Sequence, residues 1–325
     1  MREPSNRRQP TKVLVTGANG FIGKQLCEYL VLTNHHVRAA VRKASGKPPG
    51  LDTIEVADIG PQTDWQKALS GVDAVVHLVS PSLQATAKSL VEYRRVNVLA
   101  SENLARQAAM AGVKRLVFLS TIKVNGETTK ERPFSSDVPP QPVSAYGQSK
   151  WEAECALTHV ASETGLEVVI IRPPLVYGPG VRGNFLQLLR WVDSGVPMPF
   201  AWLPNSRSLV SLYNLCDLIQ LSINHPAAVG GTFLVSDGDD VTLQMLASQL
   251  AKVMEKPSRV WPFPELLFRL LGKAMGKQVE IQKLCDSLQV DIAKTSSTLG
   301  WKPPFNVQSG LEKTVHWYME SRGKN

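Results

Sequence analysis

The sequence predicts an α/β fold in which a doubly wound parallel sheet is joined to a smaller C-terminal α/β domain. Two observations lead to this prediction. Short apolar runs alternate with helix-like segments from residue 11 to residue 172, and a glycine-rich turn directly follows the first run. This alternation is typical of parallel strands joined by right-handed helical crossovers. At 325 residues, the chain is long enough for one large α/β domain or two interleaved lobes around a cleft.

The predicted strands are short runs rich in Val, Ile and Leu. They cover Thr11–Thr16, His36–Val41, Ile54–Ala57, Asp73–Leu78, Arg115–Ser120 and Val168–Arg172. Helices are predicted between them, over Phe21 to about Thr33, Asp64–Ser70, Val91–Ala111 and from near Ala145. The first half of the chain therefore repeats strand and helix.

The chain changes character after Arg172. Six prolines between 173 and 204 predict a loop-rich stretch. A strand at Thr232–Val235 is expected to return to the sheet. From about Glu255 onward the chain is expected to be helical, apart from a Trp-Lys-Pro-Pro loop at Trp301–Pro304.

Composition narrows the class of protein. Hydrophobic residues make up 43% of the chain and charged residues 20%, an ordinary globular balance. Residues 1–12 are basic without the apolar core of a signal peptide, and no later apolar run is long enough to span a bilayer. We therefore expect a cytoplasmic protein without membrane insertion. Four scattered cysteines show no metal-ligand spacing and are interpreted as buried thiols in a reducing compartment: Cys27, Cys155, Cys216 and Cys285.

The formal net charge of +8 would attract anions. Because the basic residues are spread along the chain without a nucleic-acid-binding motif, no nucleic-acid partner is expected. A small phosphorylated substrate or a 2′-phosphorylated cofactor explains the charge as well.

The glycine-rich turn has the spacing of a phosphate-binding loop. Gly17 allows a tight turn, Gly20 lets a pyrophosphate approach the backbone, and Gly23 lets the following helix pack close to the strand. The exposed amides and the helix dipole would then hold the anion. An ordinary glycine-rich turn is the alternative, but the strand before and the helix after favour dinucleotide binding.

Cofactor choice is read at the end of the second predicted strand, where an NAD enzyme usually has an acid. This chain has Arg42 and Lys43 instead. Arg42 could pair with a 2′-phosphate, so NADP is favoured, with NAD as the alternative and solvated loop charges as the third interpretation. Asp58, after the third strand, could accept from the adenine amino group or be an ordinary turn residue.

Tyr146 and Lys150 are four residues apart on a predicted helix and hence on one face. A tyrosine can exchange a proton with a carbonyl oxygen at neutral pH if a nearby cation lowers its pKa, and Lys150 would be that cation. Thr121, at the end of the strand just before, offers a hydroxyl to orient the carbonyl. Chance surface residues are the alternative, which the strand-end hydroxyl makes less favourable.

These motifs together resemble the extended short-chain dehydrogenases, particularly the nucleotide-sugar epimerase/dehydratase branch. The resemblance covers nearly the whole chain, through Thr16–Gly23, Ser120-Thr121, the Tyr146/Lys150 pair and Arg172–Pro179. It implies a Rossmann domain, expected at 10–172 plus about 208–250, and a nucleotide-sugar substrate domain at 173–207 plus about 251–325. Residues 1–9 would form a flexible N-terminus.

The resemblance also implies roles for individual residues. Thr121 matches the catalytic Ser/Thr of the family, Tyr146 its acid/base and Lys150 the partner that also holds the nicotinamide ribose. Asn97 matches an Asn on the helix lining the cofactor, and Pro173 lies where the chain passes the nicotinamide. Further candidate cofactor contacts are Asn19, Phe21, Ile22, Ile59, Leu78 and Val79, and Ser80 is a further candidate substrate contact.

Two segments resemble the substrate site of the nucleotide-sugar branch. Asn184, within Gly183-Asn184-Phe185, resembles an Asn that contacts the nucleoside diphosphate, and Arg207 resembles a diphosphate-binding Arg. A helix cap and a surface charge, respectively, are the alternatives.

The chain departs from typical 4-epimerases of the branch at two places. The acid at the end of the second strand is absent, and the usual VYG after the catalytic Ser/Thr is Val124-Asn125-Gly126. The segment 120–127 resembles a bacterial subgroup associated with surface-polysaccharide gene products, several of which reduce a 4-keto nucleotide sugar.

The leading hypothesis is therefore an NADP-dependent 4-ketoreductase acting on a UDP-linked 6-deoxy-4-keto-hexosamine or similar sugar. A UDP-hexose 4-epimerase with retained NAD is the alternative. A steroid- or flavonoid-type ketoreductase and a non-catalytic dinucleotide-binding regulator are less favoured, the last because Thr121, Tyr146 and Lys150 are all present. A homodimer through two paired helices is a family expectation.

Overall fold

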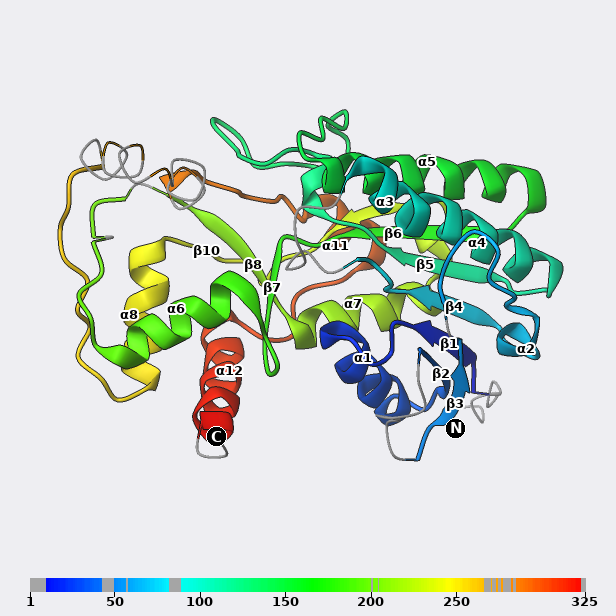
Figure 1. Cartoon of the computed structure of the whole chain (residues 1–325), viewed down its shortest axis with the longest axis horizontal. Coiled ribbons are helices and arrows are strands. Elements are labelled where there is room, and N and C mark those ends of the chain that lie inside the picture. Colours follow the sequence, from blue (N-terminus) through cyan, green and yellow to red (C-terminus); the bar gives the residue numbers. More distant parts are fainter. Residues whose placement is uncertain are drawn as a thin grey trace, which may run out of the picture.

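The computed structural model describes residues 10–42, 50–56, 58–81, 89–199, 201–203, 205–265 and 285–322, together with residues 270, 273, 276 and 282 (Figure 1). It contains two sheets of unequal size. Within the described residues, no helix is both long enough and apolar enough to cross a membrane.

The larger sheet has seven strands in the order β3-β2-β1-β4-β5-β6-β9, and every neighbouring pair is parallel. Its strands are β1 (Lys12–Thr16), β2 (His36–Val41), β3 (Asp52–Glu55), β4 (Ala74–His77), β5 (Arg115–Leu119), β6 (Glu167–Arg172) and β9 (Thr232–Leu234). The doubly wound parallel sheet predicted from the sequence is confirmed.

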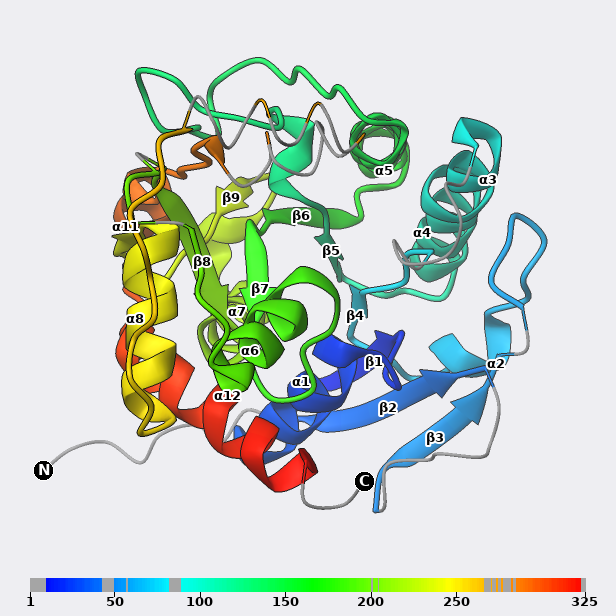
Figure 2. The same ribbon diagram turned by 60° about the vertical axis from the view of Figure 1, so that its left-hand side comes forward.

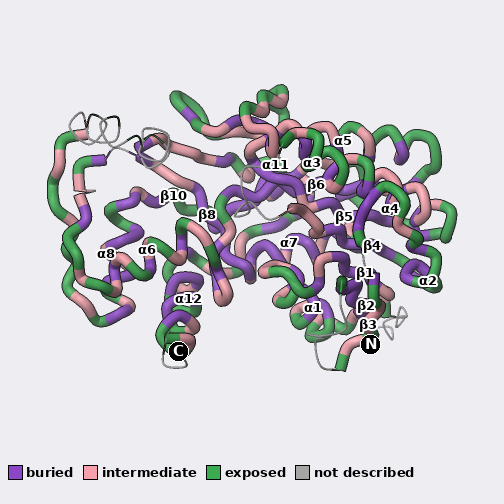
Figure 3. Tube along the Cα trace, in the orientation of Figure 1, coloured by how far each residue is buried: buried purple, intermediate pink, exposed green. Residues whose placement is uncertain are grey.

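Helices bury both faces of this sheet, because a parallel sheet leaves neither face for water. The first face packs against α1 (Phe21–Leu32), α7 (Leu212–Asn224) and α11 (Ala293–Leu299), and the second against α2 (Gln66–Leu69), α4 (Ala100–Met110) and α5 (Ala145–Thr164). Side chains alternate between the two cores: Val13 and Val15 lie in the first and Leu14 in the second. Figure 2 shows α4 and α5 on one side and α1 on the other, and Figure 3 shows buried residues concentrated in the central strands.

The smaller sheet has three strands, β10 (Asp240–Val241), β8 (Arg207–Ser211) and β7 (Leu175–Tyr177), with β8 in the middle. It shares a third core with α6 (Gly183–Ser194), α8 (Leu243–Val253) and α12 (Val307–Arg322). In Figure 1 these elements form a lobe beside the carboxyl ends of the large-sheet strands. The division into two domains at the residues expected from the sequence stays a prediction.

The remaining helical turns are short. They are α3 (Leu90–Arg94), the π-helical turn η1 (Arg95–Leu99) and the 3-10 turns η2 (Ile122–Val124) and η3 (Pro226–Ala228). The helix predicted over Val91–Ala111 is confirmed as one continuous helical run from Leu90 to Met110, with the π-helical turn inside it.

Two expectations for the second half of the chain are wrong. The stretch predicted to be loop-rich contains α6, because its prolines flank the helix instead of interrupting it. Residues 256–264, predicted to be helical, run as extended chain: Trp261 donates its amide to the carbonyl of Met198 at 2.8 Å. Pro257, Pro262 and Pro264 lack amide donors, which disfavours a helix there.

The cysteine interpretation also needs a correction. Cys27, Cys216 and Cys285 are buried, as expected, but Cys155 is exposed on α5. All four are free thiols. Cys155 is exposed because the buried face of α5 is occupied by its neighbours Ala153, Glu154 and Leu157.

Arg115, at the start of β5, donates hydrogen bonds to the backbone carbonyls at the end of α7. Its Nη1 donates to the carbonyl oxygens of Ser222, Ile223 and His225 at 3.0, 3.0 and 2.9 Å, and its Nη2 pairs with Glu167 at 2.6 Å. The last carbonyls of a helix have no partners within the helix, so a buried guanidinium here joins helix to sheet.

We expect Arg115→Met to lower the free energy of unfolding by about 2–3 kcal/mol, because it leaves buried carbonyls without donors. Chemical denaturation measures this change. Arg106→Met is the matched control: Arg106 pairs with Glu102 and Glu163 at the surface, and its loss should change stability little. Equal losses in the two variants would contradict the capping role.

Candidate dinucleotide and catalytic site

The turn between β1 and α1 forms a cradle lined by glycines, and larger residues at these positions would fill it with their side chains. Gly17 has φ +73°, and a Cβ at Gly23 would stand 2.2 Å from the Gly17 carbonyl oxygen. Gly20 caps α1 without a side-chain hydrogen bond, and the first turn of α1 carries no acidic residue. The start of α1, with the positive end of its dipole, thus meets a turn whose glycines leave the backbone uncovered by side chains, which fits a pyrophosphate.

The end of β4 lies against this cradle. A Cβ at Gly17 would stand 3.4 Å from Leu78 and Val79, and the Leu78 amide donates to Thr16 Oγ1 at 3.3 Å. The chain then continues to Ser80. Its Oγ is buried and interacts with the Tyr146 phenol, whose pKa burial raises and this contact lowers. Ser80 therefore links the segment after β4 to the predicted acid/base on α5.

The other predicted residues of the turn differ in exposure. Asn19 is exposed, whereas Phe21 and Ile22 are half-buried at the start of α1. Phe21 lies beside the turn at Gly180, where an added Cβ would stand 3.6 Å from its ring. The phosphate turn is thus near the smaller lobe.

Tyr146 and Lys150 lie one turn apart on α5, as the spacing predicts. The start of α5 packs on the backbone after β5: a Cβ at Gly147 would stand 2.6 Å from the Lys123 carbonyl oxygen. This close approach brings Tyr146 to the segment that begins with Thr121. The structure therefore brings together the strand end and the helix that carry the three predicted catalytic residues.

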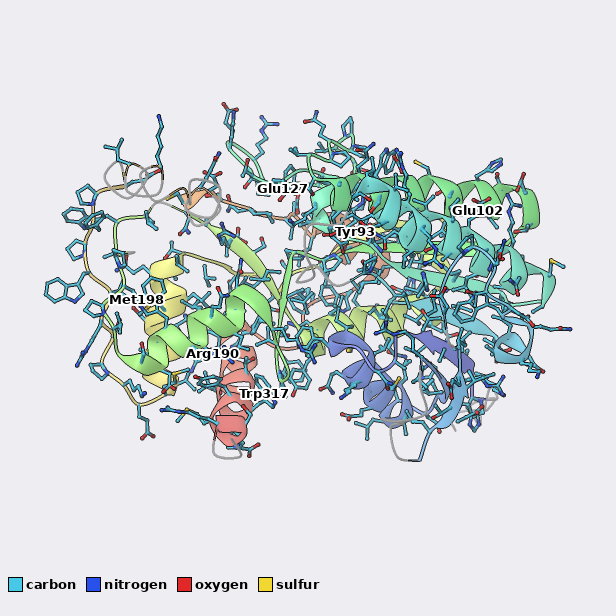
Figure 4. All side chains as sticks on the ribbon, in the orientation of Figure 1. Tyr93, Glu102, Glu127, Arg190, Met198 and Trp317 are labelled. Atoms are coloured by element: carbon cyan, nitrogen blue, oxygen red, sulfur yellow. The ribbon has the colours of Figure 1, made fainter. Side chains whose placement is uncertain are left out.

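Further contacts hold this junction. Ser144 caps α5 and donates its hydroxyl to Glu127 Oε1 at 2.7 Å. The rings of Tyr93 and Tyr146 meet edge to face, with centroids 5.7 Å apart. Figure 4 shows Tyr93 and Glu127 close to the start of α5. Thr121 is 9% exposed, and its Oγ1 accepts from the Lys123 amide at 3.3 Å.

Lys150 is buried beneath the end of β5. Its Nζ donates to the Leu119 carbonyl at 2.6 Å and lies 3.8 Å from the centroid of the Phe118 ring. Burial lowers the pKa of Lys150 to about 7, and the nearby Glu154 carboxylate opposes this shift. The ammonium form is therefore finely balanced near neutral pH.

The expectation that Lys150 lowers the pKa of Tyr146 is wrong for this structure. Burial raises the pKa of Tyr146 to about 12; the Ser80 hydroxyl opposes the rise and Tyr93 adds to it. Removal from water disfavours the phenolate just as it disfavours the ammonium, and Lys150 directs its charge to the Leu119 carbonyl.

Asn97 lies in the π-helical turn η1, fully buried. Its Nδ2 donates to Ser149 Oγ at 2.9 Å, and Ser149 in turn donates to the Tyr146 carbonyl at 2.8 Å. Its Oδ1 lacks a partner among the described residues. π-helical turns are frequent at functional sites, and this one directs an amide toward the catalytic helix.

The residues predicted to bind the adenosine part of the cofactor follow β2 and β3. Arg42 is exposed directly after β2, and Lys43 lies outside the described residues. Asp58 accepts from Arg95 Nη2 at 2.8 Å, so its carboxylate already has a partner. Ile59 is buried beside it, in the second core.

The remaining predicted residues lie after β6 and in the smaller lobe. Pro173 is buried, and its carbonyl accepts from the Ile122 amide at 2.9 Å. Asn184 is exposed in the first turn of α6. Arg207 begins β8, donates to the Asp286 carbonyl at 2.9 Å, and has its pKa lowered by burial. Across the described part of the chain, no group of three His, Cys, Asp or Glu residues could hold a metal ion.

Sequence reasoning missed three residues at this site: Gly147, Glu154 and Arg172. Glu154 and Arg172 form a buried ion pair at 2.5 Å, with Glu154 on the helix that carries the predicted residues Tyr146 and Lys150. The signal for Glu154 was available, since it follows Lys150 at the spacing that separates Lys150 from Tyr146. The requirement for glycine at 147 depends on the approach of another segment, which one sequence does not show.

The chain is similar to known proteins over nearly its whole length. The family model described as NAD dependent epimerase/dehydratase family matches residues 13–235. A protein of Vibrio cholerae named UDP-glucose 4-epimerase is 42% identical over 325 residues, covering 98% of this chain and 99% of its own length. A second relative, from Escherichia coli O157:H7, is 28% identical over 94% of each chain; it is named N-acetyl-alpha-D-glucosaminyl-diphospho-ditrans,octacis-undecaprenol 4-epimerase.

Solved structures share the fold at lower identity. UDP-glucose 4-epimerase of Thermotoga maritima with UDP-glucose has a TM-score of 0.76 at 22% identity, over 96% of this chain and 100% of that one. UDP-glucuronic acid 4-epimerase of Bacillus cereus in complex with NAD has a TM-score of 0.78 at 21% identity, over 97% and 99%. The Rossmann-type sheet with a smaller C-terminal sheet is thus a known architecture.

We expect Gly23→Ala to weaken dinucleotide binding by on the order of tenfold or more, because its Cβ would displace the Gly17 carbonyl and distort the cradle. Fluorescence titration with NAD measures this. Gly112→Ala is the control: Gly112 has φ +79° but open space around its Cβ, so the variant should lose stability and retain affinity. Unchanged affinity in Gly23→Ala would place the dinucleotide elsewhere.

Proposed function

The chain belongs to the NAD dependent epimerase/dehydratase family, and from that premise we propose that it is a UDP-hexose 4-epimerase that retains its NAD. The observation that carries the proposal is 42% identity over 98% of this chain to a relative named UDP-glucose 4-epimerase. The sequence alone favoured a 4-ketoreductase over an epimerase. The relative's name supports the alternative better than that first hypothesis.

The residues present fit a dinucleotide. The cradle of Gly17, Gly20 and Gly23 presents open backbone, and the buried Asn97 Oδ1 has no partner among the described residues. When bound, NAD supplies a hydride acceptor and donor at its nicotinamide. The chain's own contribution is to bind the sugar, orient its C4 and move one proton.

Tyr146 is the proposed acid/base. Its Oη would take the proton of the sugar 4-hydroxyl as C4 loses its hydrogen as hydride. Oη would return a proton to that oxygen when C4 regains a hydride on its opposite face. The Thr121 hydroxyl would orient that oxygen, and Lys150 Nζ would hold the nicotinamide ribose near the phenol. Because burial raises the pKa of Tyr146 to about 12, the group is a neutral phenol at neutral pH. It must lose its proton before it can take one from the sugar, and an added positive charge nearby would favour that phenolate.

The diphosphate of the substrate is assigned to the smaller lobe, through Asn184 and Arg207. Partial burial lowers the pKa of the Arg207 guanidinium, a cost that a bound anion would offset. Ser80 would contact the sugar beside Tyr146. We accordingly propose two domains. Residues 10–172 plus about 208–250 would bind the cofactor, and residues 173–207 plus about 251–325 would bind the substrate.

A 4-ketoreductase is the second candidate, because Arg42 stands where NAD enzymes usually have an acid. The segment after Thr121 adds to this: Asn125 replaces the usual aromatic residue, and its Oδ1 accepts from Arg172 at 2.9 Å. The two activities use the same residues. They differ in whether the cofactor undergoes a net change of redox state.

We expect the protein to interconvert UDP-glucose and its C4 epimer without net formation of reduced nicotinamide. Proton NMR of the two sugars and the absorbance of reduced nicotinamide measure this. Tyr146→Phe should lower turnover by roughly 10²–10⁴-fold with NAD affinity retained, because the ring stays and the proton carrier is removed. Tyr93→Phe, which alters the neighbouring ring, is the control and should retain most turnover.

Near-normal turnover in Tyr146→Phe would refute the acid/base assignment. Stoichiometric consumption of NADPH with a 4-keto nucleotide sugar, and no epimerisation, would replace the epimerase by the ketoreductase.

Substitution of Arg42 tests whether the protein prefers NADP or NAD. If Arg42 pairs with a 2′-phosphate, Arg42→Ala should weaken NADPH binding roughly tenfold and leave NADH binding unchanged, since NADH lacks that phosphate. Fluorescence titrations of both cofactors measure the ratio. Equal binding of both cofactors by the wild type would favour NAD and leave Arg42 as a solvated charge.

A further inference from the structure

Behind the proposed catalytic residues lies a buried polar cluster: Ser120, Glu154 and Arg172, with exposed fractions of 4%, 1% and 3%. Ser120 donates its hydroxyl to Glu154 Oε1. Arg172 donates Nε to the same oxygen at 3.0 Å and Nη2 to Oε2 at 2.5 Å. The carboxylate is therefore bound on both oxygens.

This cluster joins the three elements that carry the site. Ser120 follows β5 and precedes Thr121, Arg172 ends β6 and precedes Pro173, and Glu154 lies on α5. Further bonds extend the connection on either side. Arg172 Nη1 donates to Asn125 Oδ1 at 2.9 Å, and Asn125 Nδ2 donates to the Ser135 carbonyl at 3.0 Å.

A buried ion pair of this kind is weak as a device for stability. Removing two charges from water costs several kcal/mol per ion, and an apolar pair of similar volume often serves a core as well or better. Its position calls for a separate explanation. Glu154 follows Lys150 by four residues, so that Tyr146, Lys150 and Glu154 lie on successive turns of one face of α5.

The other charged or titratable groups around Lys150 offer it no comparable partner in the described part of the chain. His77, on β4, is fully buried between Thr16 and Ser101, and burial lowers its pKa to about 3, so it is neutral. Tyr146, on α5, is neutral as well, since its pKa is raised to about 12. β5 offers the Leu119 carbonyl and the Phe118 ring, which carry no net charge.

Of the remaining neighbours, Tyr93 of α3 faces Tyr146, and Arg172 of β6 is paired with Glu154. Glu154 is thus the carboxylate that acts on Lys150, and it opposes the effect of burial on the ammonium.

We propose that Glu154 is a positioning residue: clamped by Ser120 and Arg172, it joins α5 to the ends of β5 and β6 and keeps Lys150 in its ammonium form. The inference rests on the proposed role of Lys150 at the nicotinamide ribose for its functional meaning. The charge effect itself can be measured without cofactor or substrate.

The test follows the titration of Lys150 Nζ directly by NMR in lysine-labelled protein, with Lys150→Met identifying the signal. In Glu154→Gln, which keeps the shape and removes the charge, we expect the midpoint to fall by about 0.5–1 pH unit, because the carboxylate that opposes the effect of burial on Lys150 is lost. Glu154→Asp keeps the charge and shortens the reach, so its midpoint should stay near that of the wild type. Glu152→Gln is the matched control: Glu152 lies on the same helix and pairs with Arg94 at the surface.

If Glu154→Gln does not fold, the double variant Glu154→Met/Arg172→Met removes both charges without leaving one unpaired, and a fall in the midpoint is again expected. An unchanged midpoint in the folded charge-removing variant would overturn the proposal. Equal shifts in Glu154→Asp and Glu154→Gln would also overturn it, because shape and not charge would then control Lys150.

A second readout separates this inference from the proposed function. NAD affinity measured against pH should fall as Lys150 loses its proton, and this fall should begin at lower pH in Glu154→Gln than in the wild type. A wild type that shows the NMR shift but neither binds NAD nor epimerises UDP-glucose would refute the proposed function and leave the charge effect established.

Discussion

Both faces of the seven-stranded parallel sheet must be buried, and the rest of the structure depends on this constraint. The strands all run parallel, so the segments that follow β1, β4, β5 and β6 emerge on one side of the sheet, at the edge where these strands end. That edge receives the glycine cradle, Ser80, Thr121 and Pro173, although they are up to 156 residues apart in sequence between Gly17 and Pro173. The smaller lobe, built on β7, β8 and β10, lies beside it.

The cost of burial dominates the chemistry of this edge. Water is excluded from both the Tyr146 phenol and the Lys150 ammonium, so each is driven toward its neutral form. The Glu154 carboxylate opposes this for Lys150, and Arg172 and Ser120 in turn satisfy Glu154. Charge at the site is therefore maintained by a second group of residues that touch no reacting atom, and a change in them would alter protonation without removing a contact to the ligand.

The smaller lobe is attached by polar groups as well as by apolar packing. Asp237, after β9, accepts from the Tyr177 hydroxyl at 2.6 Å, from the Ser211 amide at 2.8 Å and from Asn214 Nδ2 at 2.6 Å. Burial raises the pKa of Asp237, and these hydrogen bonds oppose the rise. Tyr177 belongs to β7, so one buried carboxyl joins the small sheet to the end of the large one. This connection helps to hold the smaller lobe against the larger sheet.

The sequence by itself determined the features that are local. Apolar alternation and glycine spacing predicted β1, β2, β4, β5 and β6, the phosphate turn and the shared face of Tyr146 and Lys150, because each depends on neighbours within a few residues. Only the tertiary structure decided the rest. The glycine at 147 depends on the Lys123 carbonyl, the protonation of Lys150 on its burial and on Glu154, and the position of Arg207 on Asp286. Desolvation and close packing act between segments that the chain brings together only on folding, so no pattern along one sequence could show them.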